Sequence, residues 1–374
     1  MIRGLPFKLN RKDFAGVAIS VFFILGSYQQ TAAEKTTLKI AIVGDTGIGE
    51  RAFYHGFLAV ATALEKEKPD LLLHLGDFVY QSEVFPETCE VQYKNDIFQY
   101  LVKPFSLHLF VPGDNDLPPM KDKPMASNCW EYIESLDAPF DEIQGSSKIA
   151  PGPSEGTKTV GNVLFAILNS YYESDPTPWL KPRIAKARGK GHWVIVAIHE
   201  PALTTAWFIE KRQALLKGLN QLQPDFVFAG NQHSYERFHS IGIPNPDGTL
   251  PTEKSDTSEY KRGKGTIHII SGGGGAMFKP FADLQGKKKR TAPKEVFDAL
   301  AIRALMNHYV VLEVSENAVK GKTVRVCPDM ENIQIGKTDP RWKSHKKLMW
   351  RNIPLACNGL PRGTDIYDRF LLHK

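Results

Sequence analysis

The sequence predicts an α/β fold with largely parallel sheets, and two of its features support this prediction. The first is a series of short apolar runs, each followed by polar residues, which is typical of strands buried on both faces. The second is the presence of amphipathic helical patterns between these runs, because alternating strands and helices produce parallel sheets. The composition agrees, since 42% of the 374 residues are hydrophobic and 24% are charged. That balance is ordinary for a globular protein and excludes a disordered chain, a collagen-like repeat and a polytopic membrane protein.

The predicted elements follow from these patterns in chain order. Five strands that end directly before polar clusters are expected at residues 38–43, 71–75, 107–111, 193–198 and 226–229. Further strands are expected at residues 162–168 and 266–270, and a late antiparallel hairpin at residues 309–314 and 323–326. Helices are expected at residues 50–66 and 209–222, where apolar side chains share one helical face. Residues 113–158 and 241–264 are rich in Pro, Gly and Ser, and we interpret them as long functional loops because strands resume on both sides.

The N-terminal segment 1–33 has the layout of a secretory signal peptide. Four basic residues precede the apolar run 14–26, and small residues suited to cleavage end at Ala33. A helix of that length spans about 20 Å, which is less than the ~30 Å core of a bilayer. We therefore expect cleavage near Ala33 and export to a periplasm or out of the cell, with a soluble mature protein. An uncleaved membrane anchor and a buried helix are the alternatives.

Four cysteines follow this segment, and an even number in an exported chain suggests disulfides. Three connectivities are possible for Cys89, Cys129, Cys327 and Cys357. We favour Cys89–Cys129 and Cys327–Cys357, because each pair flanks a loop-rich region in which a cross-link would restrict the unfolded chain.

The net charge of +6 is too small to indicate a nucleic-acid partner. The segments 287–290 and 341–374 are basic, and we interpret them mainly as solvated surface. Weak contact of the basic C-terminal region with anionic surfaces is the alternative. The sequence leaves the oligomeric state open.

Polar clusters follow five of the predicted strands, at the edge where open α/β sheets bind ligands. Their members are Asp45, Asp77, Tyr80, Asp114, Asn115, Asp116, His199, Glu200, Asn231 and His233. Carboxylates mixed with imidazoles and a phenol suit Mn, Fe or Zn better than a metal that prefers thiolates. A single Asp after a strand commonly caps a helix. Five clusters in strand order instead predict a metal site.

Several of these motifs resemble the calcineurin-like metallophosphoesterases, and among them the purple acid phosphatase branch. The motifs are GDTG (44–47), GDFVY (76–80), IHEP (198–201), NQHSYER (231–237) and GTIHIISGGGGA (265–276). The resemblance covers roughly residues 38–315. It implies a four-layer α/β/β/α sandwich of two mixed sheets, a dinuclear metal centre and hydrolysis of phosphate esters. We expect residues 38–330 to form the catalytic domain and residues 331–374 to form a basic extension packed on or flanking it.

The resemblance implies a ligand set for each of two metal ions. For the first ion, the family's ligands match Asp45, Tyr80 and His233, and Asp77 matches the carboxylate that bridges both ions. Tyr80 implies Fe at this first site. The second site retains His199 but departs from the family at two ligands. Asp114 stands in place of Asn and Asn231 in place of His, which favours Mn or Mg, with Zn as the further candidate.

The expected catalytic residues are Asn115 and Asp116. Asn115 replaces a family histidine that contacts the phosphate, and an amide can hydrogen-bond a phosphoryl oxygen but cannot act as a general acid. Asp116 or Glu200 could supply the proton if burial raises its pKa, or both could merely orient neighbouring groups. His74 and His268 are interpreted as buried residues of the core or as residues that support the metal ligands, and Glu236 is expected to pair with Arg237.

The predicted function is metal-dependent hydrolysis of a small phosphate ester, a monoester or a diester, by a metal-activated water at the dinuclear centre. The alternative is a non-catalytic metal- or phosphate-binding protein on a degenerate phosphoesterase scaffold, which Asn115 and Asn231 favour.

Overall fold

The computed structural model describes residues 37–49, 54–80, 87–118, 126–137, 140–141, 154–169, 175–207, 212–279, 281–284, 286–327 and 363–374. The predicted signal segment lies outside these described residues. All the elements below belong to one compact unit that begins at Thr36. Among the described residues, no helix combines the length and the apolar character that a membrane span requires.

The first sheet contains seven strands in the order β10-β15-β14-β13-β1-β2-β3. These are β10 Glu259–Lys261, β15 Gly363–His373, β14 Ala318–Cys327, β13 Asn307–Val314, β1 Leu38–Val43, β2 Leu71–His74 and β3 His108–Phe110. Strands β1, β2 and β3 are parallel to one another. Strand β13 is antiparallel to both β1 and β14, so the sheet is mixed and the predicted late hairpin is confirmed.

The second sheet contains eight strands, seven of them in the order β12-β8-β11-β7-β6-β5-β4, and its remaining strand β9 pairs with β8. These are β12 Leu300–Ala304, β8 Tyr235–Ile241, β11 Thr266–Ser271, β7 Phe226–Ala229, β6 Trp193–Ile198, β5 Val163–Leu168, β4 Gly156–Val160 and β9 Thr252–Glu253. Strands β5, β6, β7 and β11 are parallel. Strand β8 runs antiparallel to β11, and β4 runs antiparallel to β5, so this sheet is also mixed.

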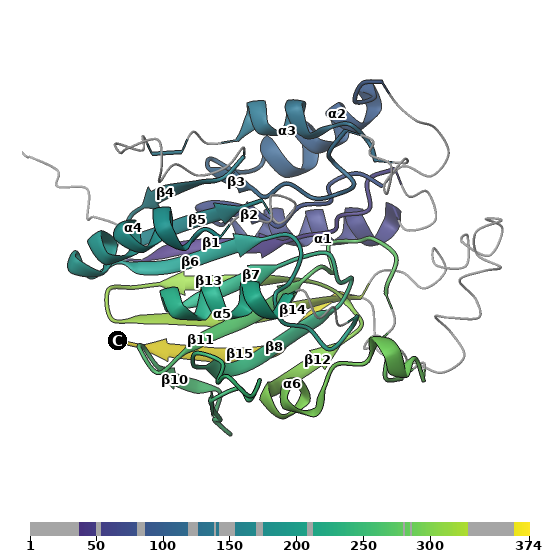
Figure 1. Ribbon diagram of the computed structural model, residues 1–374. Helices are drawn as coiled ribbons and strands as arrows, with labels where there is room; N and C mark the ends of the chain where they lie inside the picture. Colours follow the sequence, from purple (N-terminus) through teal and green to yellow (C-terminus); the bar gives the residue numbers. More distant parts are fainter. Residues whose placement is uncertain are drawn as a thin grey trace, which may run out of the picture. The chain divides into compact units, whose positions relative to one another are not determined.

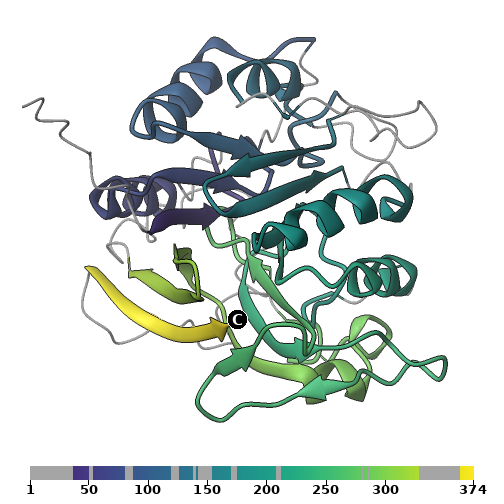
Figure 2. The same ribbon diagram turned by 90° about the vertical axis from the view of Figure 1, so that its left-hand side faces the viewer.

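The two sheets pack face to face, with helices on their outer sides (Figures 1 and 2). Helices α1 Tyr54–Glu67, α2 Val91–Ile97 and α3 Trp130–Leu136 pack on the first sheet. Helices α4 Thr177–Gly189, α5 Arg212–Leu222 and α6 Lys294–Ala299 pack on the second. Short helical segments lie at Phe98–Val102 and Lys288–Arg290. The four-layer α/β/β/α prediction is confirmed.

Burial on both faces explains why the central strands read as continuous apolar runs. In β1, Ile40 and Ile42 belong to the core between the sheets, whereas Ala41 and Val43 pack against the outer helices. A strand covered on both sides has no solvent face, so its sequence does not alternate with polar residues.

Parts of the two predicted loops are regular structure. Residues 113–158 include α3 and most of β4. Helix α3 is stabilised because Trp130 and Ile133 pack in the core between the first sheet and its helices, and β4 is stabilised because it pairs with β5. Residues 241–264 include β9 and β10. The loop prediction was therefore wrong at these positions, where short elements are stabilised by tertiary contacts that a local pattern does not reveal.

One predicted disulfide is present. Cys89 and Cys129 are bonded, at a sequence separation of 40. The bond ties the segment before α2 to the residue that directly precedes α3. Cys327 is also disulfide-bonded. Its predicted partner Cys357 lies outside the described residues, so the Cys327–Cys357 pair stays a prediction.

Candidate metal centre

The predicted site residues are brought together where the parallel strands of both sheets end. Asp45 follows β1, Asp77 follows β2 and Asp114 follows β3 in the first sheet. His199 follows β6 directly, and Asn231 follows β7 in the second sheet. Asp45, Asp77 and His199 are fully buried, so these groups are removed from bulk water.

The backbone at three of these strand ends adopts a left-handed conformation. Asp45, Asp77 and Asn231 have φ angles of 59°, 57° and 61°. Asp and Asn tolerate this region better than most side chains, yet it still costs about 1 kcal/mol or more per residue. Such strain is common at functional sites, where surrounding contacts hold the residue in place.

Close backbone packing explains why glycine belongs to these motifs. A Cβ atom at Gly113 would lie 2.1 Å from the backbone nitrogen of Asp77, and one at Gly230 would lie 2.8 Å from Oδ2 of Asp45. No larger residue fits at Gly113 without moving the loop that carries Asp77. The glycines therefore allow the strand ends to approach closely enough for their acidic side chains to converge.

Four groups converge in a first cluster around the phenol oxygen of Tyr80. This oxygen lies 2.7 Å from Asp45 Oδ1, 2.9 Å from Asp77 Oδ2 and 3.0 Å from His233 Nε2. His233 Nε2 also lies 3.2 Å from Asp45 Oδ1. The other ring nitrogen of His233 contacts the carbonyl oxygen of Met277, which directs Nε2 into the cluster. These are the four residues that the family resemblance assigns to the first metal ion.

A second cluster shares Asp77. His199 Nε2 lies 3.3 Å from Asp77 Oδ1 and 3.4 Å from Asp114 Oδ1. The Nδ1 atom of His199 lies 2.6 Å from the carbonyl oxygen of Leu75, which fixes the orientation of the ring. Asp77 therefore faces one cluster with each of its two carboxylate oxygens.

The donor set fits metal ions. Ligand atoms of Asp45, Asp77 and His199 all lie within 4.8 Å of one another. Burial alone would lower the pKa of His199, but Asp77 and Asp114 raise it well above its usual range. Conversely, burial would raise the pKa of Asp77, but His199 lowers it. Three carboxylates buried around one imidazole form a negative site, and such a site favours a cation, which would take the place of a proton on His199.

Asn115 and Asp116 both contact the Asp77 segment, but in different ways. The Asn115 side-chain amide donates to Asp77 Oδ2 at 2.6 Å, and its backbone N–H donates to Asp77 Oδ1 at 2.9 Å. Asp116 is fully buried and accepts backbone hydrogen bonds from Asp77, Phe78 and Val79 at 2.8–3.2 Å. Burial and the charge of Asp77 raise the pKa of Asp116. Because both oxygens of Asp116 bind backbone amides, the geometry favours an orienting role over proton donation.

Asn231 has a neighbour that the sequence did not reveal. Its backbone N–H donates to Asp45 Oδ2 at 2.9 Å. Its side-chain Oδ1 accepts a hydrogen bond from Lys279 Nζ at 3.1 Å, and its carbonyl oxygen accepts another from the same ammonium. Lys279 lies 48 residues further along the chain and belongs to none of the motifs, so no spacing in the sequence signalled it.

The predicted Glu236–Arg237 pair is not formed. Glu236 instead accepts hydrogen bonds from Thr204 and Thr205, whereas Arg237 pairs with Asp368 of β15. Neighbouring residues of a strand point to opposite faces, so two consecutive side chains of β8 cannot meet. Glu236 thereby holds the segment that follows His199.

His74 and His268 are buried, as expected. The ring of His74 stacks on Phe78, with centroids 3.6 Å apart, and burial lowers its pKa. His268 Nε2 lies 2.8 Å from Asn220 Oδ1, and burial lowers its pKa to about 3. Both rings are therefore neutral groups of the core.

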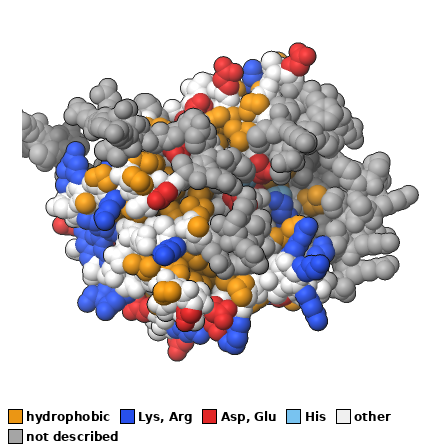
Figure 3. Space-filling view, viewed as in Figure 1, with side chains coloured by type: hydrophobic (Ala, Val, Ile, Leu, Met, Phe, Trp, Pro, Cys, Tyr) orange, Lys and Arg blue, Asp and Glu red, His pale blue; other side chains and the backbone are white. Residues whose placement is uncertain are grey.

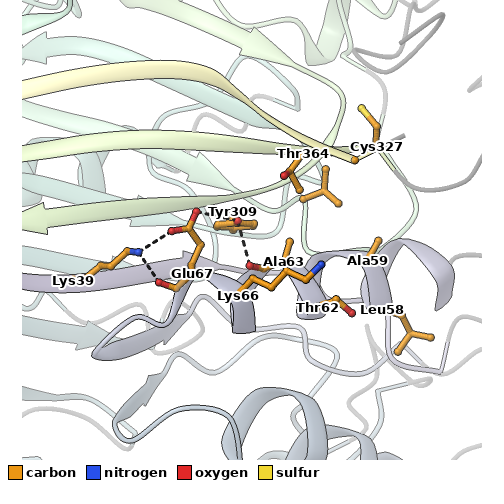
Figure 4. Close-up of a pocket in the computed structure, with 12 residues that line it drawn as sticks. Lys39, Leu58, Ala59, Thr62, Ala63, Lys66, Glu67, Tyr309, Cys327 and Thr364 are labelled. Atoms are coloured by element: carbon orange, nitrogen blue, oxygen red, sulfur yellow. Dashed lines mark hydrogen bonds and ion pairs between the residues drawn. The ribbon is translucent and has the colours of Figure 1, made fainter. Parts of the chain in front are cut away.

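A pocket of about 550 Å³ lies apart from these clusters, beside α1 (Figure 4). Glu67 is one of the residues that line it. The Glu67 carboxylate lies 2.8 Å from Lys39 Nζ and 3.0 Å from Lys322 Nζ. Burial raises the pKa of Glu67, but the two lysines outweigh burial and lower it. None of the predicted site residues lines this pocket.

Two mixed sheets that carry carboxylates and imidazoles on their parallel strand ends define a metallophosphoesterase-like protein. A family model described as calcineurin-like phosphoesterase matches residues 38–235. This is more than half of the 374 residues, and the chain belongs to that family.

Similar proteins support the purple acid phosphatase branch. Probable purple acid phosphatase 20 of Arabidopsis thaliana is 24% identical over 235 residues, covering 57% of this chain and 49% of that protein. A Mycobacterium tuberculosis protein is 33% identical over 119 residues, covering 29% of this chain and 22% of its own length. The solved structure of a purple acid phosphatase from yellow lupin (Lupinus luteus) seeds shares the fold. Its TM-score is 0.59 at 14% identity, with 91% of this chain and 54% of that chain covered. This chain thus spans no more than about half the length of these relatives.

Proposed function

We propose that this chain is a metal-dependent hydrolase of small phosphate esters. Membership of the calcineurin-like phosphoesterase family supports phosphate-ester hydrolysis in general. The observation that carries the proposal is the convergence of two ligand clusters on Asp77. One of its oxygens lies 2.9 Å from the Tyr80 phenol, and the other lies 3.3 Å from His199 Nε2. A carboxylate placed in this way can serve two cations at once.

The proposed ligands of the first ion are Asp45, Asp77, Tyr80 and His233, and we propose Fe there because a phenolate is among them. The proposed ligands of the second ion are Asp77, Asp114 and His199, with Asn231 as the further predicted ligand and Mn, Zn or Mg as the ion. When bound, such ions supply Lewis acidity that lowers the pKa of water and neutralises phosphoryl charge.

The protein's own groups hold this arrangement in place. Asp116 fixes the backbone of the Asp77 loop through three amides, and it also accepts a hydrogen bond from Gly113 of its own loop at 3.3 Å. Asn115 places an amide N–H beside Asp77, from where it can donate to a phosphoryl oxygen. Because an amide cannot transfer a proton, Asn115 is proposed to bind and orient the substrate.

A second candidate function is non-catalytic binding of metal or phosphate, which the replacement of two family histidines by Asn115 and Asn231 favours. Metal analysis of the purified full chain, followed by a p-nitrophenyl phosphate assay with each metal restored, distinguishes the two. Turnover of the metal-loaded protein above that of the metal-free protein supports the hydrolase function. Bound metal without turnover, under conditions in which inorganic phosphate also binds, supports the second candidate.

Export with cleavage near Ala33 and a catalytic domain at residues 38–330 remain part of the proposal. Strand β15 of the C-terminal extension pairs with β14 and so adds to the sheet of that domain. Mass spectrometry of the protein's N-terminus tests the cleavage. On the face shown in Figure 3, Lys and Arg side chains lie in separate groups with acidic and hydrophobic side chains between them.

Tyr80→Phe is expected to abolish the visible absorption of the iron-loaded protein. A phenolate bound to Fe(III) gives a charge-transfer band, and phenylalanine lacks the oxygen that would bind. Absorption spectra and iron content of both proteins measure this effect. Tyr132→Phe is the control, since its hydroxyl contacts the Lys94 carbonyl, away from the candidate centre. A band that persists in Tyr80→Phe, or a colourless iron-loaded wild type, would exclude Tyr80 as a ligand.

A further inference from the structure

The side chain of Lys279 is held at the candidate centre by the segment that follows β11. Within this segment, the N–H of Gly274 donates to the Gly44 carbonyl at 2.9 Å, and the N–H of Ala276 donates to the Asp45 carbonyl at 3.0 Å. The Met277 carbonyl contacts the ring of His233. The backbone leading to Lys279 is therefore attached to the same strand ends that carry the metal-ligand candidates.

Asn231 fixes the end of the Lys279 side chain. Both its carbonyl oxygen and its Oδ1 atom, at 3.1 Å, accept hydrogen bonds from the ammonium. Asn231 itself is held by the hydrogen bond from its N–H to Asp45 Oδ2, at 2.9 Å. Asn suits this position because it tolerates the φ of 61° and because its side-chain oxygen can turn toward a cation.

An ammonium at Asn231 Oδ1 conflicts with a metal ion at the same atom. Two unit positive charges about 4 Å apart repel by about 4 kcal/mol at the effective dielectric constant of a protein surface, and a divalent ion increases the repulsion. Asn231 is thus better suited to hold Lys279 than to bind the second metal ion. Asp77, Asp114 and His199 remain as the protein groups of the second cluster.

A neutral donor lies at the same centre as this ammonium. The side-chain amide of Asn115 donates to Asp77 Oδ2 at 2.6 Å, and the backbone N–H of Asn231, which holds the ammonium, donates to Asp45 Oδ2 at 2.9 Å. A cationic donor and a neutral amide donor therefore border the cluster to which Asp45 and Asp77 belong, and phosphoryl oxygens are bound by donors of these two kinds.

We propose that Lys279 binds a phosphoryl oxygen of the substrate and that Asn231 positions it for this role. This inference rests on the proposed function and assigns the substrate-binding cation of the same site. It also gives Asn231 a different role from the one that the family resemblance implied.

The test is calorimetric titration of the metal-loaded full chain with inorganic phosphate, combined with metal analysis of each variant. Lys279→Met is expected to bind phosphate about tenfold to a hundredfold more weakly, which is the usual effect of removing a charge-assisted hydrogen bond. Its metal content should equal that of the wild type. Lys288→Met is the matched control, because it removes an exposed lysine a short distance further along the chain and should leave phosphate affinity unchanged.

Two further variants keep the test decisive if Lys279→Met folds poorly. Lys279→Arg retains the charge and should bind phosphate more tightly than Lys279→Met. Asn231→Gly removes the anchoring side chain, and glycine accepts the left-handed backbone. It should keep its metal content and bind phosphate several-fold more weakly.

Unchanged phosphate affinity in Lys279→Met overturns the proposal, and loss of one metal equivalent in Asn231→Gly overturns the anchoring role. Because the titration measures binding directly, a protein without turnover would contradict the proposed function but leave the phosphate site standing. Turnover that survives in Lys279→Met with unchanged phosphate affinity would contradict the phosphate site alone.

Discussion

Asp77→Asn is expected to remove more metal than any other single substitution and to lower turnover roughly 10³-fold or more. Asp77 contacts both clusters, through Tyr80 on one oxygen and His199 on the other. The amide of asparagine replaces one carboxylate oxygen by a hydrogen-bond donor that repels cations. Metal ions contribute several kcal/mol to phosphoryl transfer, and a loss of about 1.4 kcal/mol already corresponds to a tenfold lower rate.

Metal content by elemental analysis and turnover of p-nitrophenyl phosphate check this expectation. Asp298→Asn is the control, because Asp298 is exposed and forms its ion pair with the exposed Lys294 in α6, away from the candidate centre. Asp114→Asn should have a smaller effect than Asp77→Asn, since Asp114 is a proposed ligand of the second ion and Asp77 is a proposed ligand of both. Near-normal metal content and turnover in Asp77→Asn would contradict a shared carboxylate at this position.

The fold could be predicted from sequence wherever burial leaves a strong local signal. The predicted strands 193–198 and 226–229 coincide with β6 and β7, because both faces of these strands are covered and the whole run must be apolar. The elements that were missed depend on distant contacts. Strand β15 is one of them, since polar and apolar side chains do not alternate cleanly along it, with Ile366 exposed and Asp368 buried. Its position is determined by pairing with β14, which lies far earlier in the chain.

The candidate site could be predicted because its residues follow strands, and topology brings parallel strand ends to one edge. This rule placed Asp45, Asp77 and His199 together without any structure. It could not place Lys279, which follows a glycine-rich segment and meets Asn231 only through the course of that segment. It also could not decide the role of Asp116, because the sequence does not show which backbone amides this side chain binds.

A buried ion pair joins the last strand to the opposite sheet. Arg237 of β8 donates to Asp368 of β15 through Nε at 2.6 Å and through Nη2 at 3.0 Å. The hydroxyl of Tyr235 donates to Asp368 at 2.7 Å. Arg237 also donates to the Tyr260 hydroxyl through Nη1 and to the Ser258 hydroxyl through Nη2, each at 2.9 Å. Burial alone would lower the pKa of Arg237, but Asp368 raises it, so the guanidinium is charged.

Asp368→Ala is expected to lower the free energy of unfolding by about 3–5 kcal/mol, because it leaves the charge of Arg237 buried without its carboxylate. Urea unfolding of wild type and variant measures this loss. Asp365→Ala, on the same strand, is the control, since Asp365 pairs with Arg325 at the surface and such pairs contribute about 1 kcal/mol or less.

The double variant Arg237→Met, Asp368→Leu removes both charges and should recover most of the loss, because apolar side chains can replace a buried ion pair. Equal losses in Asp368→Ala and Asp365→Ala would show that the buried pair does not hold β15 against the second sheet. A double variant as unstable as Asp368→Ala would show that packing around Asp368, and not the uncompensated charge, is what the substitution destroys.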